Sequence, residues 1–240
     1  MLPPPGYVAY GGPGAYSGAF QGIARVTKAM VVLLWIYLPL QLLSIVDLLR
    51  LRREATRFLN GDQTEQRFKD AVRVNASSLT GLMTIPIAVL TMIWMFRMAA
   101  NLRKLGRPGQ TWAPGWGIGA WFVPPCIIYA VPWLMFKELW RGSDPAIPQG
   151  DPAWKRAPVP SLVTVWWVMY GLVPLLGVFS AAGVAGQLRA GVNTHTLAQR
   201  FRDFGAINIV FTVIGMATTL IYMRLVRDLS ARHMQATREV

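Results

Sequence analysis

Long apolar stretches alternate along this chain with short segments that are rich in arginine and lysine. Four of the stretches have about the 20 mostly apolar residues that a helix needs to cross the hydrocarbon core of a bilayer. The pattern therefore predicts an all-α fold, a polytopic helical membrane protein. The four predicted spans cover residues 29–49, 76–97, 162–185 and 206–224.

A fifth apolar stretch, residues 111–136 and hereafter the connector, is long enough to cross but contains helix-breaking residues. Proline removes a backbone donor and kinks a helix, and a Pro-Pro pair in mid-span leaves carbonyl groups that only neighbouring protein can satisfy. The connector is therefore either a kinked fifth span or a re-entrant pair of half-helices, which gives four or five spans. Its prolines are Pro114, Pro124, Pro125 and Pro132.

The same pattern divides the chain into three parts. Residues 1–27 are predicted to be a disordered tail, because a segment dominated by glycine and proline cannot bury enough surface to fold alone. Residues 28–232 form the membrane domain, and residues 233–240 form a C-terminal tail. Within the membrane domain, residues 51–73 are predicted to be an amphipathic surface helix whose phenylalanines dip into the membrane interface.

Two similar pentapeptides indicate an internal repeat. The sequence Gln-Arg-Phe-Lys-Asp at 66–70 precedes the second span, and Gln-Arg-Phe-Arg-Asp at 199–203 precedes the last. The repeat predicts two helical hairpins joined by the connector. The two similar loops are expected on one side of the membrane, which favours an even number of crossings with both termini inside. The distribution of Lys and Arg does not decide the orientation.

Composition and charge agree with this interpretation. Only 15% of the residues are charged, against about 25% in a typical soluble domain. The net charge of +13 is spread over separate short loops that flank the apolar stretches, as the positive-inside rule and anionic headgroups lead one to expect. The sequence therefore predicts the lipid bilayer as a partner and does not predict a nucleic acid.

The segment around the connector carries a specific order of motifs. It begins with Arg97-x-x-x-Asn101-Leu-x-x-Leu-Gly106, followed by Pro114-Gly115-Trp116, Pro124, Pro132, and Glu138-Leu-Trp140-Arg141 with Ser143. This order resembles the bacterial membrane-protein family catalogued as domain of unknown function 4328. The resemblance covers residues 29–232, implies a multi-pass protein of the bacterial plasma membrane, and implies no activity.

Residues with catalytic or metal-binding chemistry are few. Both histidines, His195 and His233, are predicted at the surface. Neither is paired with a cysteine or a carboxylate at the sequence spacing that is typical of metal ligands. Glu138 is predicted to lie at a solvated or salt-bridged helix end rather than to act as a catalytic acid. Apart from Arg97 and Arg224, which end their spans, Asp47 is the one charged residue within a predicted span, and it is expected to pair with Arg50 one helical turn later. No enzymatic activity, cofactor or metal is therefore expected.

Two functions fit these observations. Gly177, Ala181 and Ala185 recur every four residues and predict close packing against another helix or subunit. The leading hypothesis is a scaffold or interaction subunit that binds another membrane protein or a second copy of itself. The alternative is a small transporter or channel, in which the connector lines a cavity that Asn101, Arg103 and Asp47 would face.

Overall fold

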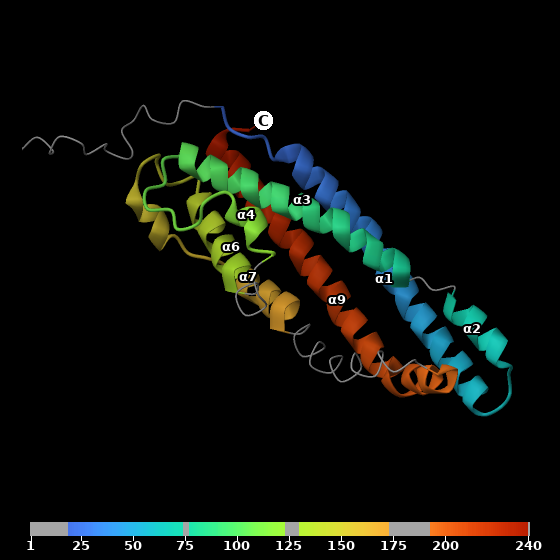
Figure 1. Cartoon of the computed structure of the whole chain (residues 1–240). Helices are drawn as coiled ribbons and strands as arrows, with labels where there is room; N and C mark the ends of the chain where they lie inside the picture. The colour runs from blue at the N-terminus through green and yellow to red at the C-terminus, as the bar shows by residue number, and fades with distance from the viewer. Residues whose placement is uncertain (1–18, 74–76, 123–129, 173–192, 240) are drawn as a thin grey trace, which may run out of the picture. The chain divides into compact units, whose positions relative to one another are not determined.

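The structure is a computed structural model that describes residues 19–73, 77–122, 130–172 and 193–239. Within these residues every regular element is a helix and no strand occurs (Figure 1), so the predicted all-α class is confirmed. The elements are α1 (Ala24–Leu59), α2 (Glu65–Arg73), α3 (Ser77–Lys104), α4 (Trp116–Gly119), α6 (Ala130–Gly142), η1 (Pro152–Arg156), α7 (Ser161–Trp167), η2 (Val168–Leu172) and α9 (Thr194–Thr237).

Three of the described helices, α1, α3 and α9, are long and apolar enough to cross a membrane. α1 contains the predicted span 29–49, and α9 contains the predicted span 206–224. α3 begins at Ser77 and contains the rest of the predicted span 76–97. α9 has 44 residues, which at 1.5 Å per residue is about 66 Å. Because the hydrocarbon core is only about 30 Å thick, the ends of α9 would extend well beyond a bilayer that its apolar part crosses.

The predicted span 162–185 is described only in part. Its first residues form α7 and η2, and residues 173–185 lie outside the described residues. The small-residue stripe of Gly177, Ala181 and Ala185 lies there too, so its packing stays a prediction.

The connector is also described in part. It contains α4 and the first half of α6, while residues 123–129, with Pro124, lie outside the described residues. Three candidate spans are thus found, and the count of four or five stays a prediction.

Two helix ends differ from the expected domain boundaries. α1 begins at Ala24, before the expected boundary at residue 28, because the residues just ahead of it are fixed by hydrogen bonds and Ile23 is fully buried. At the other terminus, α9 continues through the expected C-terminal tail to Thr237. Both His233 and Thr237 are buried, so packing of one face carries this helix past the point where the sequence becomes polar.

Contacts between residues divide the chain into two compact units. Unit 1 contains residues 1–29, 89–163 and 225–240, and unit 2 contains residues 30–88 and 164–224. The core of unit 1 is built on the end of α3, which buries side chains four residues apart, Trp94, Met98 and Leu102. The ring of Trp94 lies 5.8 Å from that of Phe136 in α6, so the helix that ends the connector packs on α3.

Unit 2 has an aromatic cluster where α1, α2 and α9 meet. Phe68 is fully buried, stacks on Phe58 with ring centroids 5.3 Å apart, and meets Phe201 edge-on at 6.4 Å. The prediction that these phenylalanines dip into the membrane interface is therefore wrong for Phe68, which packs against protein. The predicted single surface helix is also interrupted, since the chain turns at Gly61 with a φ of +81°.

Candidate functional site

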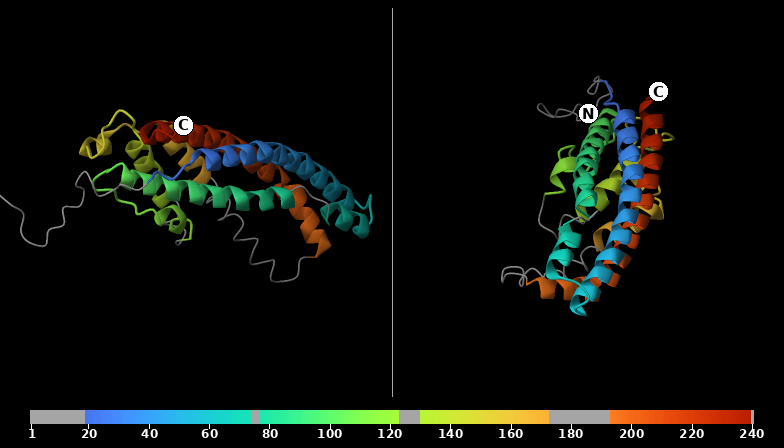
Figure 2. Two further views of the ribbon diagram at one scale, coloured as in Figure 1. Left: turned by 90° about the horizontal axis from the view of Figure 1, so that it is seen from above. Right: turned by 90° about the vertical axis from the view of Figure 1, so that its right-hand side faces the viewer.

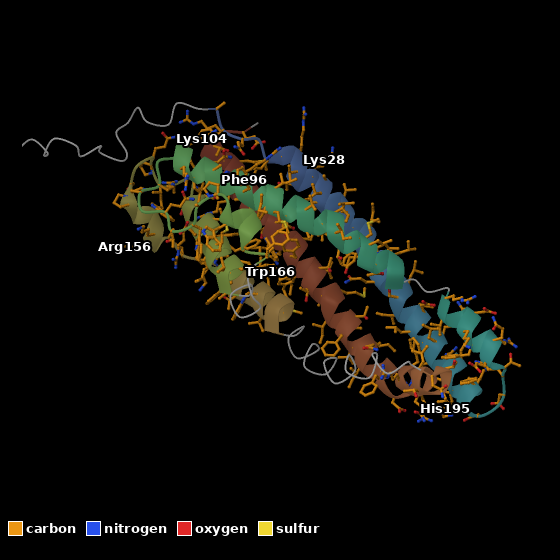
Figure 3. All side chains as sticks on the ribbon, viewed as in Figure 1. Lys28, Phe96, Lys104, Arg156, Trp166 and His195 are labelled. Carbon is orange, nitrogen blue, oxygen red and sulfur yellow. The ribbon has the colours of Figure 1, made fainter. Side chains whose placement is uncertain are left out.

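A fully buried polar cluster links three helices of unit 1. It consists of Asn101 in α3, Ser143 just after α6, and His233 in α9, and we call it the His233 cluster. The Ser143 hydroxyl lies 2.7 Å from His233 Nδ1, and the Asn101 side-chain amide nitrogen lies 3.1 Å from His233 Nε2. All three side chains have no exposed surface. The expected surface position of His233 is therefore wrong, whereas His195 is exposed at the start of α9, where Figure 3 labels it.

The hydrogen-bond directions in this cluster fix His233 as neutral. Asn101 Oδ1 accepts the backbone N–H of Gln21 at 2.8 Å, so the amide nitrogen of Asn101 is the group that faces His233 and donates to Nε2. The remaining ring nitrogen, Nδ1, then carries the proton and donates to Ser143. His233 lies beyond Met223, where the apolar part of α9 ends. Burial lowers the pKa of His233 to about 4, which agrees with a neutral ring.

The two ends of the described chain meet at the same place. Asn101 also donates to the Gln21 carbonyl at 2.8 Å. The carboxylate of Glu239 accepts the backbone N–H groups of Ile23 and Ala24 at 2.9 to 3.0 Å, which are free donors at the start of α1. The start of α1 and the end of α9 accordingly lie side by side, as Figure 2 shows.

A second row of polar contacts lies one helical turn from the His233 cluster. Trp94 is fully buried, and its indole N–H donates to the hydroxyl of Ser230 at 2.9 Å. The same hydroxyl lies 2.9 Å from that of Thr27. These contacts join α1, α3 and α9 by side chains alone, so the two rows hold the ends of all three long helices together within unit 1.

Arg107 fastens the chain that follows α6. Its guanidinium is almost fully buried and donates only to backbone carbonyls, those of Gly142, Asp144, Ile147 and Pro148, at 2.8 to 3.1 Å. Burial lowers the pKa of Arg107, while the carboxylates of Asp144 and Asp151 raise it. With its donors occupied by the protein's own carbonyls, Arg107 holds the loop after α6 in place rather than offering a site for an external anion.

Glu138 closes the connector on itself. Its two carboxylate oxygens accept the backbone N–H groups of Thr111 and Trp112 at 2.9 and 3.0 Å. The side chain is buried, so the expectation of a solvated or salt-bridged helix end is replaced by a charge-assisted contact to backbone donors. The first residues of the connector therefore lie beside α6, whose first half is the last part of the connector.

The other motif residues near α3 have local structural roles. Arg97 donates to the Gly22 carbonyl at 2.8 Å. Gly106 adopts a φ of +62° and ends α3, with the N–H of Arg107 bonded to the Leu102 carbonyl at 3.2 Å, the geometry for which glycine is the favoured residue.

The motif residues of the connector and α6 are similarly placed. The carbonyls of Pro114 and Gly115 accept the first hydrogen bonds of α4, and Trp116 meets Trp112 edge-on at 5.5 Å. In α6, Pro132 is buried and Arg141 lies in the last turn. The ring of Trp140 stacks under Arg232, whose Cζ lies 5.4 Å from the ring centroid.

A serine beside a histidine can form a nucleophile and its base, but the His233 cluster lacks the access that such chemistry needs. Neither Ser143 nor His233 has exposed surface. A cavity of about 420 Å³ in unit 1 is lined by other residues, among them Phe20, Arg107 and Arg238. Within the described residues, no group of three or more His, Cys, Asp or Glu side chains could hold a metal. The arrangement of the His233 cluster thus supports a structural role, in which its hydrogen bonds hold the helices of unit 1 together.

Sequence reasoning missed His233 and Arg107 as central residues. For His233, a signal exists in the spacing of buried residues after Arg224: Val226, Leu229 and His233 follow at helical intervals, so one face of the helix continues past the last apolar run. For Arg107, no local pattern distinguishes it from the other basic residues, because its partners are backbone carbonyls far along the chain.

The family model described as Domain of unknown function (DUF4328) matches residues 57–231. The chain belongs to the DUF4328 family. The match includes Asn101, Glu138 and Ser143 and ends before His233, so DUF4328 membership covers two of the three members of the His233 cluster. No curated protein and no solved structure matches the chain. DUF4328 membership therefore supplies a family but no activity.

Proposed function

We propose that this DUF4328 protein is an integral membrane scaffold or interaction subunit without enzymatic activity. The observation that carries the proposal is the bare apolar surface of its long helices. Protein buries only 22%, 17% and 11% of the most apolar windows of α1, α3 and α9. Such surfaces need an apolar cover, which lipid and the helices of a membrane partner can supply.

The polar side chains within these helices support the same function. Thr219 donates to Gln41 at 3.3 Å, and the Ser44 and Thr80 hydroxyls lie 2.8 Å apart, as expected for hydrogen bonds that pair helices in lipid. The carboxylate oxygen Oδ1 of Asp47 lies 3.9 Å from Nη1 of Arg50, one helical turn away. A transport path normally requires ionisable groups that face a water-filled space, and the pairing of Asp47 with Arg50 does not favour such a role.

One of the residues expected to face the cavity of a transporter is buried within the protein instead. Asn101, which would face the cavity in a transporter, is fully buried and bonded to His233 and Gln21. The scaffold function therefore has the stronger support.

The contacts at the connector favour four crossings over five. If the connector crossed the bilayer, its two ends would lie about 30 Å apart, yet Thr111 and Trp112 are hydrogen-bonded to Glu138. We therefore place the connector as a re-entrant segment that returns to the side it left. The contact between Ile23 and Glu239 supports a location of both ends of the described chain on that same side, as an even number of crossings requires.

Photo-crosslinking in native membranes tests the scaffold function. A photoreactive amino acid is placed at the exposed positions Leu43, Ile85 and Val210 and, as a matched control, at the buried Leu34. The proposal predicts one discrete adduct, with a membrane protein or a second copy, from at least one exposed position and none from Leu34. The same partner should co-purify in fixed stoichiometry with the unmodified protein.

The contrary result is adducts with lipid alone from all three exposed positions. Together with flux of a small solute or ion through proteoliposomes of the purified protein, that result would replace the scaffold with a transporter.

A further inference from the structure

The described part of the connector exposes an apolar patch in a region without charge. No Asp, Glu, Lys or Arg occurs between Arg107 and Lys137. Trp116 and Ile118 in α4 are 38% and 42% exposed, and Phe122 just after it is 74% exposed. Water is a poor environment for such neighbouring side chains, so this patch, residues 116–122, calls for an apolar neighbour.

A glycine contact places this patch at a definite level along α3. A Cβ added at Gly117 would lie 2.6 Å from the backbone nitrogen of Phe96, so α4 touches α3 there without an intervening side chain. Phe96, labelled on α3 in Figure 3, is the last apolar residue of that helix before Arg97. The patch therefore lies where α3 would leave the hydrocarbon core of a bilayer.

Two neighbouring hydrogen bonds lie close to the same boundary between the apolar and the polar parts of the long helices. Arg97 bonds to Gly22, just ahead of α1, and the buried Trp94 bonds to Ser230, beyond the apolar part of α9. All three long helices thus change from apolar to polar close to this level. Tryptophan and other aromatic side chains favour the membrane interface, where one edge contacts lipid and the other contacts water.

The patch is also held in a fixed shape. The carbonyls of Pro114 and Gly115 accept the N–H groups of Gly117 and Gly119 at 2.9 and 2.8 Å. The residues ahead of α4 are fixed by the carboxylate of Glu138. Because these contacts leave the exposed side chains uncovered, the protein presents the patch instead of folding it into its own core.

We infer that residues 116–122 are a membrane-interface wedge, whose occupant is the lipid bilayer at the depth of the glycerol groups and upper acyl chains. The inference rests on the proposed re-entrant connector and adds what its exposed edge contacts. Lipid is favoured over a protein partner because the patch is uncharged and lies level with the polar ends of the long helices. The wedge would anchor the connector and fix the depth of unit 1.

Fluorescence quenching in liposomes tests the wedge. A small thiol-reactive fluorophore is attached at Phe122→Cys in a Cys126→Ser background, with Cys126 being the only native cysteine. The quenchers are lipids with a nitroxide near the headgroup, lipids with a nitroxide near the chain end, and aqueous iodide. Pro145→Cys, at an exposed position in the polar loop after α6, is the control that faces water, and elution as a single species in size-exclusion chromatography checks that each variant is folded.

The wedge predicts strong quenching at Phe122→Cys by the shallow nitroxide, weaker quenching by the deep one, and little by iodide. It predicts the reverse at Pro145→Cys, with strong quenching by iodide and weak quenching by both nitroxides. Iodide quenching alone at Phe122→Cys overturns the wedge, because the patch then faces water. Protection from all three quenchers also overturns it, because protein then covers the patch.

A second arm separates failure of the wedge from failure of the proposed topology. The exposed positions Arg103 and Pro145, before and after the connector, are each changed to Cys and labelled with a membrane-impermeant maleimide. Labelling from one side retains the re-entrant connector, whatever the quenching shows. Labelling from opposite sides, with quenching at Phe122→Cys by the deep nitroxide, overturns both.

Discussion

The His233 cluster of unit 1 and the apolar cluster of unit 2 each join helices, but by different interactions. In unit 1, the His233 cluster joins α3, α9 and the end of α6 through hydrogen bonds between fully buried polar side chains. In unit 2, Ala55, Phe68 and Ala198 form an apolar cluster with the partly buried Phe58 and Phe201 around them. Hydrogen bonds are directional and have one correct register, whereas apolar packing depends mainly on volume.

This difference has consequences for what perturbs each unit. A buried polar cluster is stable only while every member keeps its partner, because an unpaired buried polar group costs far more than a single hydrogen bond contributes. The apolar cluster of unit 2 consists of Ala, Leu, Val and Phe side chains, none of which titrates, and His195, whose ring meets Phe58 edge-on at 6.3 Å, is exposed. The His233 cluster should therefore respond to pH and to loss of a single donor, and the apolar cluster of unit 2 should respond to loss of volume.

The largest effect is expected from Phe68→Ala in unit 2. Truncating a fully buried phenylalanine costs about 3–5 kcal/mol of unfolding free energy, and Phe68 has two aromatic neighbours. Hydrogen exchange in detergent should accelerate in α2 and the first turns of α9, with residues 94–105 of α3 unchanged. Arg67→Ala, at an exposed neighbouring position, is the control. Equal acceleration in both units would show that the two clusters are not independent.

Acidification is expected to weaken unit 1 and spare unit 2. The folded pKa of His233 is about 4, against an ordinary value of 6.5, so between these values the unfolded chain binds the proton more tightly. The stability that neutral His233 contributes is complete above pH 6.5 and is lost as the pH falls towards 4. By about pH 5 the loss is roughly 2 kcal/mol.

The protection factors of the last turns of α9 against hydrogen exchange, which are corrected for the pH dependence of exchange in an unfolded peptide, measure that loss between neutral pH and about pH 5. In the variant His233→Gln the fall in protection should disappear, while the first turns of α9 in unit 2 should show none in either protein. Protection factors that do not change with pH in the unmodified protein would contradict a neutral, buried His233.

An effect of similar size is expected from Asn101→Ala. The change removes the donor to His233 Nε2 and both contacts to Gln21, which leaves buried polar groups without partners. The expected loss is about 2 kcal/mol, visible as a lower melting temperature and faster exchange at the start of α1. Arg103→Ala, at an exposed position of the same helix, should leave both unchanged; a matching loss in that variant would assign the effect to α3 in general.

The smallest effect is expected from Glu239→Gln. Its carboxylate caps the free N–H groups at the start of α1, where a negative charge is also favoured by the helix dipole. Glutamine keeps one acceptor oxygen and loses the charge, so the expected cost is about 1 kcal/mol. Exchange should accelerate at Ile23 and Ala24 and nowhere in unit 2. An unchanged rate there would mean that Glu239 does not cap α1 in solution.

The sequence predicted the long helices well because their signal is local. Each apolar run of α1, α3 and α9 is recognisable within about 20 residues. The contact between Asp47 and Arg50 was predicted for the same reason, since helical spacing alone brings the two together.

The candidate site was predicted less well because its contacts are distant in sequence. His233 and Asn101 are 132 residues apart, and Glu138 lies 27 residues from Thr111. A polar residue near a chain end looks solvated until its partner is known, which is why His233 and Glu138 were expected at the surface. The two similar pentapeptides are an intermediate case. Their phenylalanines, Phe68 and Phe201, do meet, while the repeat itself stays a prediction.

Sidedness of labelling shows whether the connector returns to the side of the membrane that it left. Single cysteines at Arg103, Pro145 and Asp62, each in a Cys126→Ser background, are treated with a membrane-impermeant maleimide in right-side-out and inverted vesicles. All three positions are exposed, and Asp62 lies in the turn between α1 and α2. With a re-entrant connector, Arg103→Cys and Pro145→Cys should react from one side and Asp62→Cys from the other. Reaction of Arg103→Cys and Pro145→Cys from opposite sides would contradict it, because the connector would then cross the bilayer.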